Sequence, residues 1–150
     1  MNGNLNPSAR AGVLAVINPQ SAGAGTITTG WMDMQRHFAL LAILAVGTMG
    51  AGGTVDAKIE QAKDGTGAGA KDVAGSAITQ LTKASGDDNK QAVVNLRQED
   101  LDKNGAYRFA RLTVTVGAAA SFLAATLVGL DPRYGAATAN DATSVDEIAG

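Results

Sequence analysis

The sequence is poor in the residues that carry out chemistry. Its 150 residues include no cysteine and only one histidine, one tryptophan, two tyrosines and three phenylalanines. Without cysteine there are neither disulfides nor thiolate metal sites, and a reducing cytoplasm is compatible with the chain. A single imidazole with no neighbouring base or nucleophile offers no catalytic pair. We therefore predict no catalytic residue, no metal site and no cofactor.

Two stretches come nearest to a chemical site. His37 directly precedes an apolar run, and we interpret it as a residue at the edge of a strand, because histidine metal sites recruit several ligands. Asp87, Asp88 and Asn89 offer oxygen atoms, but they lack the alternating spacing of a Ca²⁺ loop. This composition is typical of a turn.

The chain has little net charge and no long hydrophobic run. Its formal charge is −2, which argues against a nucleic-acid partner, since such proteins present a basic surface. The longest apolar stretch, residues 38–49, is well short of the roughly 20 residues that cross a bilayer. We expect no membrane partner and interpret the stretch as a buried element. Its periodicity leaves strand and helix open for residues 38–46.

Glycine is abundant, with 19 residues, and it separates short runs with strand character. Apolar and polar side chains alternate in residues 54–60 and again in 107–116, the pattern of strands with one face in water. Each of these runs is joined to another apolar run by a short turn of small residues, at 50–53 and at 117–120. We interpret both arrangements as hairpins.

About eight such strands follow one another, separated by turn residues, without long helical crossovers. This rhythm predicts an all-β fold, an antiparallel β-sandwich resembling a jelly roll. We expect three parts in the chain: a flexible N-terminal arm over residues 1–11, a single sandwich domain over 12–135, and an extended C-terminal tail over 136–150. The contribution of the arm stays open.

Five residues are candidates for contacts with a partner. Tryptophan, tyrosine and arginine are enriched at the energetic centres of interfaces. Arg133 and Tyr134 belong to the distinctive stretch DPRYG, which equally suits a strand terminator with a packed tyrosine. Arg108 and Arg111 suit a basic strip or, alternatively, solvated charge that protects a strand edge. The predicted interface residues are Trp31, Arg108, Arg111, Arg133 and Tyr134.

Three stretches resemble a known group of proteins. They are residues 54–62 (TVDAKIEQA), residues 77–81 (AITQL) with 91–97 (QAVVNLR), and residues 111–117 (RLTVTVG) running on to 131–135 (DPRYG). In this order they resemble small virion structural proteins of tailed bacteriophages, over roughly residues 31–137. The resemblance transfers no catalytic residues.

The resemblance implies a non-enzymatic structural role in the virion. Its most direct form is a cement or decoration protein that binds the outside of the major capsid protein lattice and stabilises the head. It would be synthesised in the bacterial host cytoplasm and located on the capsid surface. Self-association as a dimer or trimer is also expected, since symmetric oligomers are common. The alternatives are a tail, connector or head-completion protein, a carbohydrate-binding β-sandwich and, last, an enzyme that uses His37.

Overall fold

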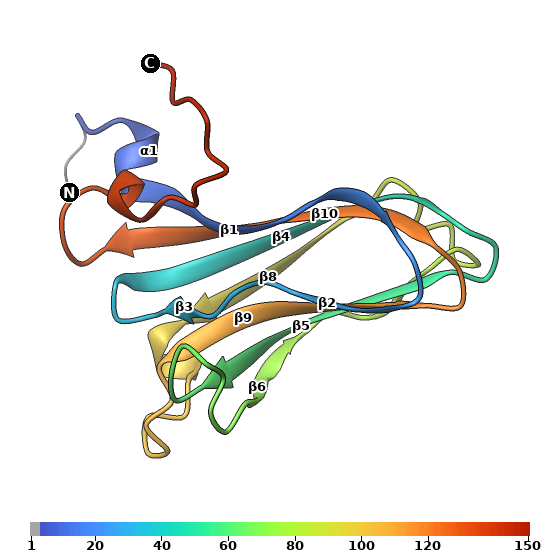
Figure 1. The fold of residues 1–150 in the computed structure, drawn as a ribbon, viewed down its shortest axis with the longest axis horizontal. Coiled ribbons are helices and arrows are strands. Elements are labelled where there is room, and N and C mark those ends of the chain that lie inside the picture. Colours follow the sequence, from blue (N-terminus) through green and yellow to red (C-terminus); the bar gives the residue numbers. More distant parts are fainter. Residues whose placement is uncertain (1–3) are drawn as a thin grey trace.

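Two antiparallel sheets packed face to face form the protein in a computed structural model that describes residues 4–150 (Figure 1). The four-stranded sheet has the order β1 (Ala11–Ala22), β10 (Ser121–Pro132), β4 (His37–Met49), β8 (Gln91–Arg97). The six-stranded sheet has the order β2 (Gly25–Thr28), β9 (Phe109–Gly117), β5 (Thr54–Ala62), β6 (Lys71–Ala77). Within it, β3 (Met32–Asp33) pairs with β9, and β7 (Leu81–Thr82) pairs with β5.

The order of the strands is that of a jelly roll. When the two-residue strands β3 and β7 are set aside, every connection between consecutive strands crosses from one sheet to the other, except that from β5 to β6. Eight strands arranged this way in two sheets make a double Greek key. The predicted all-β antiparallel sandwich of jelly-roll type is confirmed.

The two predicted hairpins are wrong. β4 and β5 lie in different sheets, and so do β9 and β10. The turns between them pack against each other: the Gly50 N–H donates to the Ala120 carbonyl at 2.8 Å, and a Cβ on Gly50 would lie 2.8 Å from the Cβ of Ala119. Both turns carry the chain between layers because each pair of strands buries its apolar faces in the same core. Alternation in a sequence indicates which face of a strand is buried, but it does not indicate which other strand pairs with it.

The core lies between the sheets and consists of aliphatic side chains of moderate size. Residues 38–46, left open as strand or helix, form the central part of β4. Alternate residues of this strand, Leu40, Ala42, Leu44 and Val46, are at most 2% exposed. The alternation predicted for residues 107–116 is confirmed from Phe109, where β9 begins, since Ala110, Leu112, Val114 and Val116 are at most 2% exposed.

The first and last segments among the described residues lie together at one end of the sandwich (Figure 1). Within the predicted N-terminal arm, residues 1–3 are outside the described residues, and Pro7–Arg10 form the short helix α1. Within the predicted tail, Ala137–Asn140 form the 3₁₀ helix η2, and Ala137 is fully buried. The tail also follows the edge of β1: Asp141 accepts a hydrogen bond from the Val13 N–H at 2.7 Å. The boundaries and the flexibility of the arm stay predictions.

Candidate interaction surface

The outer face of the four-stranded sheet is largely apolar over β10, β4 and the first half of β1, whereas on β8 Val93 lies between the outward Gln91 and Asn95. Along β4 the side chains of Leu41, Ile43 and Ala45 alternate with the buried ones and therefore point outward, where they are only half-buried. Their partners in register, such as Val128 opposite Leu41 and Val93 opposite Ile43, continue the same face across the sheet. We call this surface the apolar face. Its members are Val13, Val16, Leu41, Ile43, Ala45, Val93, Phe122, Ala124, Thr126, Val128 and Leu130.

The outer face of the six-stranded sheet has the opposite character. On β5 the outward positions are Asp56, Lys58 and Glu60, and opposite them on β9 stand Thr115, Thr113 and Arg111. Such a polar face is expected where one side of an antiparallel sheet meets water. Contiguous apolar surface on a sheet is uncommon in monomeric proteins and marks a site of interaction. The contrast between the two faces makes the four-stranded side the candidate interaction surface.

A protruding aromatic ring and a hollow lie next to each other at one end of the apolar face. Phe122 is 56% exposed. Beside it, an open hollow of about 460 Å³ is lined by Pro19, Gln20, Ala45, Val46, Gly47, Phe122, Leu123 and Ala124. The hollow exists because small side chains occupy its floor, and a Cβ on Gly47 would lie 3.1 Å from the Cβ of Phe122. This end therefore offers both a projecting group and a recess of apolar character.

Three of the predicted interface residues meet on the six-stranded sheet. The Arg111 guanidinium lies 4.4 Å from the centre of the Trp31 ring, and its Nε donates to Glu60 at 2.8 Å. Arg108 makes two hydrogen bonds to Asp33, at 2.8 and 2.7 Å. Both arginines are thus paired within the chain rather than free to form a basic strip.

The Glu60 carboxylate connects these groups. Burial by itself would raise the pKa of Glu60, but hydrogen bonds from Thr113 and Arg111, together with the charges of Arg111 and Lys58, lower it below its usual value. The carboxylate is therefore held in its ionised form. Its bonds fix Arg111 over the face of Trp31, so this indole is covered on one side and does not form an open stacking platform.

The other two predicted residues, Arg133 and Tyr134, lie just beyond β10 at one end of the four-stranded sheet. The Arg133 guanidinium lies 4.5 Å from the centre of the Phe38 ring and donates to the side-chain oxygen of Gln98. Tyr134 is 70% exposed. The five residues therefore form two separate groups on different sheets. Whether either group contacts a partner stays a prediction.

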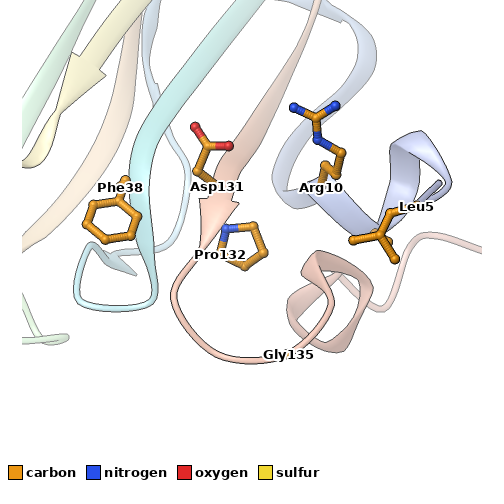
Figure 2. A pocket seen from close by; sticks show the side chains of 7 residues that line it. Leu5, Arg10, Phe38, Asp131, Pro132 and Gly135 are labelled. Atoms are coloured by element: carbon orange, nitrogen blue, oxygen red, sulfur yellow. The ribbon is translucent and has the colours of Figure 1, made fainter. Parts of the chain in front are cut away.

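A second hollow opens near this end of the sheet, between α1 and the last residues of β10 (Figure 2). Its volume is about 290 Å³, and Arg10, Phe38, Asp131 and Pro132 are among its lining residues. Asp131 adopts a left-handed backbone conformation, with φ at 51°. The lining mixes apolar side chains with one cationic and one anionic group, which suits a contact surface better than a reaction.

His37 is the first residue of β4, which is a central strand of its sheet rather than an edge. The side chain is 1% exposed, and its Nε2 has no hydrogen-bond partner among the described residues. Burial, and secondarily the charge of Arg36, lowers the pKa of this imidazole. The ring packs over Gly129, where a Cβ would approach its Cδ2 to 2.7 Å.

Other predicted candidates have local structural roles. Asp87 accepts a hydrogen bond from the Thr82 N–H at 2.9 Å, and Asp88 accepts one from the Met49 N–H at 3.1 Å. Within residues 4–150, no group of three or more His, Cys, Asp or Glu side chains is placed to hold a metal ion. The helices in this part of the chain are all too short to span a membrane.

The apolar face was not among the predicted sites, although the sequence carries a signal for it. Residues 38–46 are apolar at both odd and even positions. We interpreted this as complete burial, but only one side of the strand faces the core. An uninterrupted apolar run in an antiparallel sheet also indicates a second apolar face turned outward.

Comparisons with known proteins find distant structural likeness only. No protein-family model matches the sequence, and no curated protein matches it. A chain in the structure of Triatoma virus matches with a TM-score of 0.47 and 7% identity, over 92% of this chain and 72% of that one. A chain of infectious bursal disease virus strain Gx matches with a TM-score of 0.43 and 14% identity, over 86% of this chain and 34% of that one. Likeness at this distance assigns neither a family nor a function.

Proposed function

We propose that the protein is a non-enzymatic structural component of a tailed-bacteriophage virion, and that it acts as a cement protein on the outside of the major capsid protein lattice. The observation that carries this proposal is the exposed group beyond β10, where Arg133 is held in place next to the exposed Tyr134. A sandwich with one polar and one apolar outer face is suited to assembly, because the apolar side gains free energy when a protein surface covers it.

The resemblance of three stretches to phage virion proteins directs this assembly role to a virion. Those stretches include β5, β8 and part of β9, so they span both sheets of the fold. A protein that adds to a finished shell does not require a catalytic group. We therefore propose that none of its side chains acts as a catalyst.

The contacts with the capsid protein are proposed at the second group of candidate residues. Tyr134 is 70% exposed, and Arg133 is held next to it in the chain by contacts with Phe38 and Gln98. A fixed guanidinium next to an exposed phenol ring supplies an aromatic and a cationic anchor without a large loss of side-chain entropy. The other predicted interface residues are Trp31, which is covered, and Arg108 and Arg111, which are already paired. At a contact they would add to the fit of the surface and would not form new ion pairs.

Copy number in purified virions of the phage that encodes the protein tests this proposal. Quantitative mass spectrometry should find hundreds of copies, in a fixed ratio to the major capsid protein. The double variant R133A/Y134A should lower this ratio, whereas K103A, at an exposed position in the connection between β8 and β9, should leave it unchanged. Absence from the virion contradicts the proposal.

The second candidate is a tail, connector or head-completion protein of the same virion. It shares the apolar face and the resemblance, so copy number is the distinguishing measurement. A dozen or fewer copies for each particle would replace the cement role with this one. A carbohydrate-binding role is less favoured, since Arg111 covers one side of Trp31 and leaves Tyr134 as the exposed aromatic candidate for stacking on a sugar.

A further inference from the structure

We propose that the apolar face is the contact surface for a second copy of this chain, arranged about a two-fold axis so that Phe122 of each copy enters the hollow beside Phe122 of the other. This inference goes beyond the proposed function and does not rest on it, because it follows from the geometry of one surface. The occupant it names is a symmetric partner, not the capsid lattice.

The size of the face matches the requirement of a stable dimer. β4 has 13 residues and β10 has 12. With strands about 4.8 Å apart and a rise of about 3.3 Å for each residue, β1, β10 and β4 outline roughly 14 by 40 Å, and the seven residues of β8 add roughly 5 by 23 Å, or about 690 Å² in all. A standard protein interface buries about 800 Å² on each partner. The apolar face and its rim are therefore large enough without help from any other surface.

The charge pattern of the face permits two identical copies to meet. No member of the apolar face carries a charge, Thr126 is its one polar member, and the outward polar residues beside it on β8, Gln91 and Asn95, are neutral. The nearest charged outward residue on β8 is Arg97, at the end of the strand, where it pairs with Glu99 at 2.6 Å. Two copies packed face to face would thus bury no unpaired charge, which is the usual obstacle to self-association.

The shape of the face is complementary to itself. In a two-fold contact the same patch appears on both sides, so a projection must meet a recess that belongs to the same patch. Phe122 is the projection, and the adjoining hollow over Ala45, Gly47 and Ala124 is the recess. The small residues at three neighbouring positions leave a hollow that water fills when the face is free, whereas an aromatic ring from the partner displaces this water from an apolar surface. Such buried aromatic anchors supply most of the free energy of an interface.

Sedimentation equilibrium of the purified full chain, over a range of micromolar concentrations, tests the inference. The wild-type protein should form a dimer. Phe122→Ala and Val93→Lys alter side chains that are 56% and 54% exposed, so the fold should be kept, as circular dichroism would verify. Each change should weaken dimerisation at least about tenfold. Thr28→Lys, an exposed position on the outer face of the six-stranded sheet, is the matched control and should leave the dimer unchanged.

A fourth variant separates insertion of Phe122 from general hydrophobic adhesion. Ala124→Leu adds apolar surface but fills the hollow from within. Adhesion without a defined geometry predicts a tighter dimer, whereas insertion predicts a weaker one. A wild-type monomer, a trimer, or a dimer that survives both Phe122→Ala and Val93→Lys would overturn the inference. None of these results depends on the copy number in virions, so the two proposals fail independently.

Discussion

The buried imidazole of His37 should make the stability of the protein depend on pH in a defined window. In the unfolded chain this group titrates at its ordinary pKa of 6.5, and in the folded protein burial and Arg36 lower the pKa. Between the two values the unfolded chain binds a proton that the folded protein does not. Acidification below pH 6.5 therefore favours unfolding, and stability is regained as the pH rises through this window.

The magnitude follows from the titration of one group. A single proton changes the free energy of unfolding by at most about 1.4 kcal/mol for each pH unit. The loss should begin near pH 6.5 and end at the lowered pKa of the folded state. The window is clean because His37 is the only histidine of the chain, and carboxylates titrate mainly below it.

Urea unfolding at several pH values between 5 and 7.5 measures this effect (the approximate range in which histidine alone titrates). His37→Leu should remove the dependence, because leucine does not titrate. Arg36→Gln should reduce it, because the pKa of the folded state then rises toward 6.5. A wild-type stability that is flat across this range, or that increases on acidification, would refute the reasoning that His37 is buried in its neutral form.

Three further predictions concern local structure. Gly129→Ala should destabilise the protein by about 1–3 kcal/mol in urea unfolding, because the new methyl group would lie 2.7 Å from the His37 ring and 2.6 Å from Leu14. Gly23→Ala is the control, because Gly23 has open space around it. Equal losses of stability in the two variants would contradict the close packing at Gly129. Arg111→Met should cost about 1–2 kcal/mol because it removes the nearer of the two cations paired with the largely buried Glu60 and leaves Lys58 at 3.6 Å. Arg108→Met, whose side chain is 49% exposed, should cost about 0–1 kcal/mol, and the opposite ranking would be inconsistent with the burial of the two pairs. Asp64→Ala should speed amide hydrogen exchange at Thr66 and Ala68, whose N–H groups donate to this carboxylate at 2.9 and 3.1 Å, and unchanged exchange would show that the loop is held by other contacts.

The sequence predicted the structure correctly where a pattern of residues is compatible with only one kind of secondary structure. Alternation in residues 54–60 and 107–116 requires strands with one buried face, and β5 and β9 have it. The choice between strand and helix for residues 38–46 needed the neighbours, because β10 and β8 on either side of β4 satisfy its backbone hydrogen bonds. Local propensity does not contain that information.

The sequence did not predict which strands pair or which side chains contact each other when these residues lie far apart in the chain. The two turns of small residues permit either a hairpin or a crossing between sheets, and only the shared core selects the crossing. Candidate interface residues were chosen by type, yet Arg108 and Arg111 are paired with acids on β3 and β5. The apolar face escaped prediction because it combines residues from β1, β4, β8 and β10, which are adjacent only in the folded sheet.

A cryo-EM reconstruction of the purified virion tests the central claim most directly, since it locates the protein and both of its outer faces at once. We predict hundreds of copies on the outside of the head, each with the apolar face covered by protein and the polar face of the six-stranded sheet in solvent. Density for the protein at a single vertex, its absence from the particle, or copies whose apolar face is open to solvent would contradict the account.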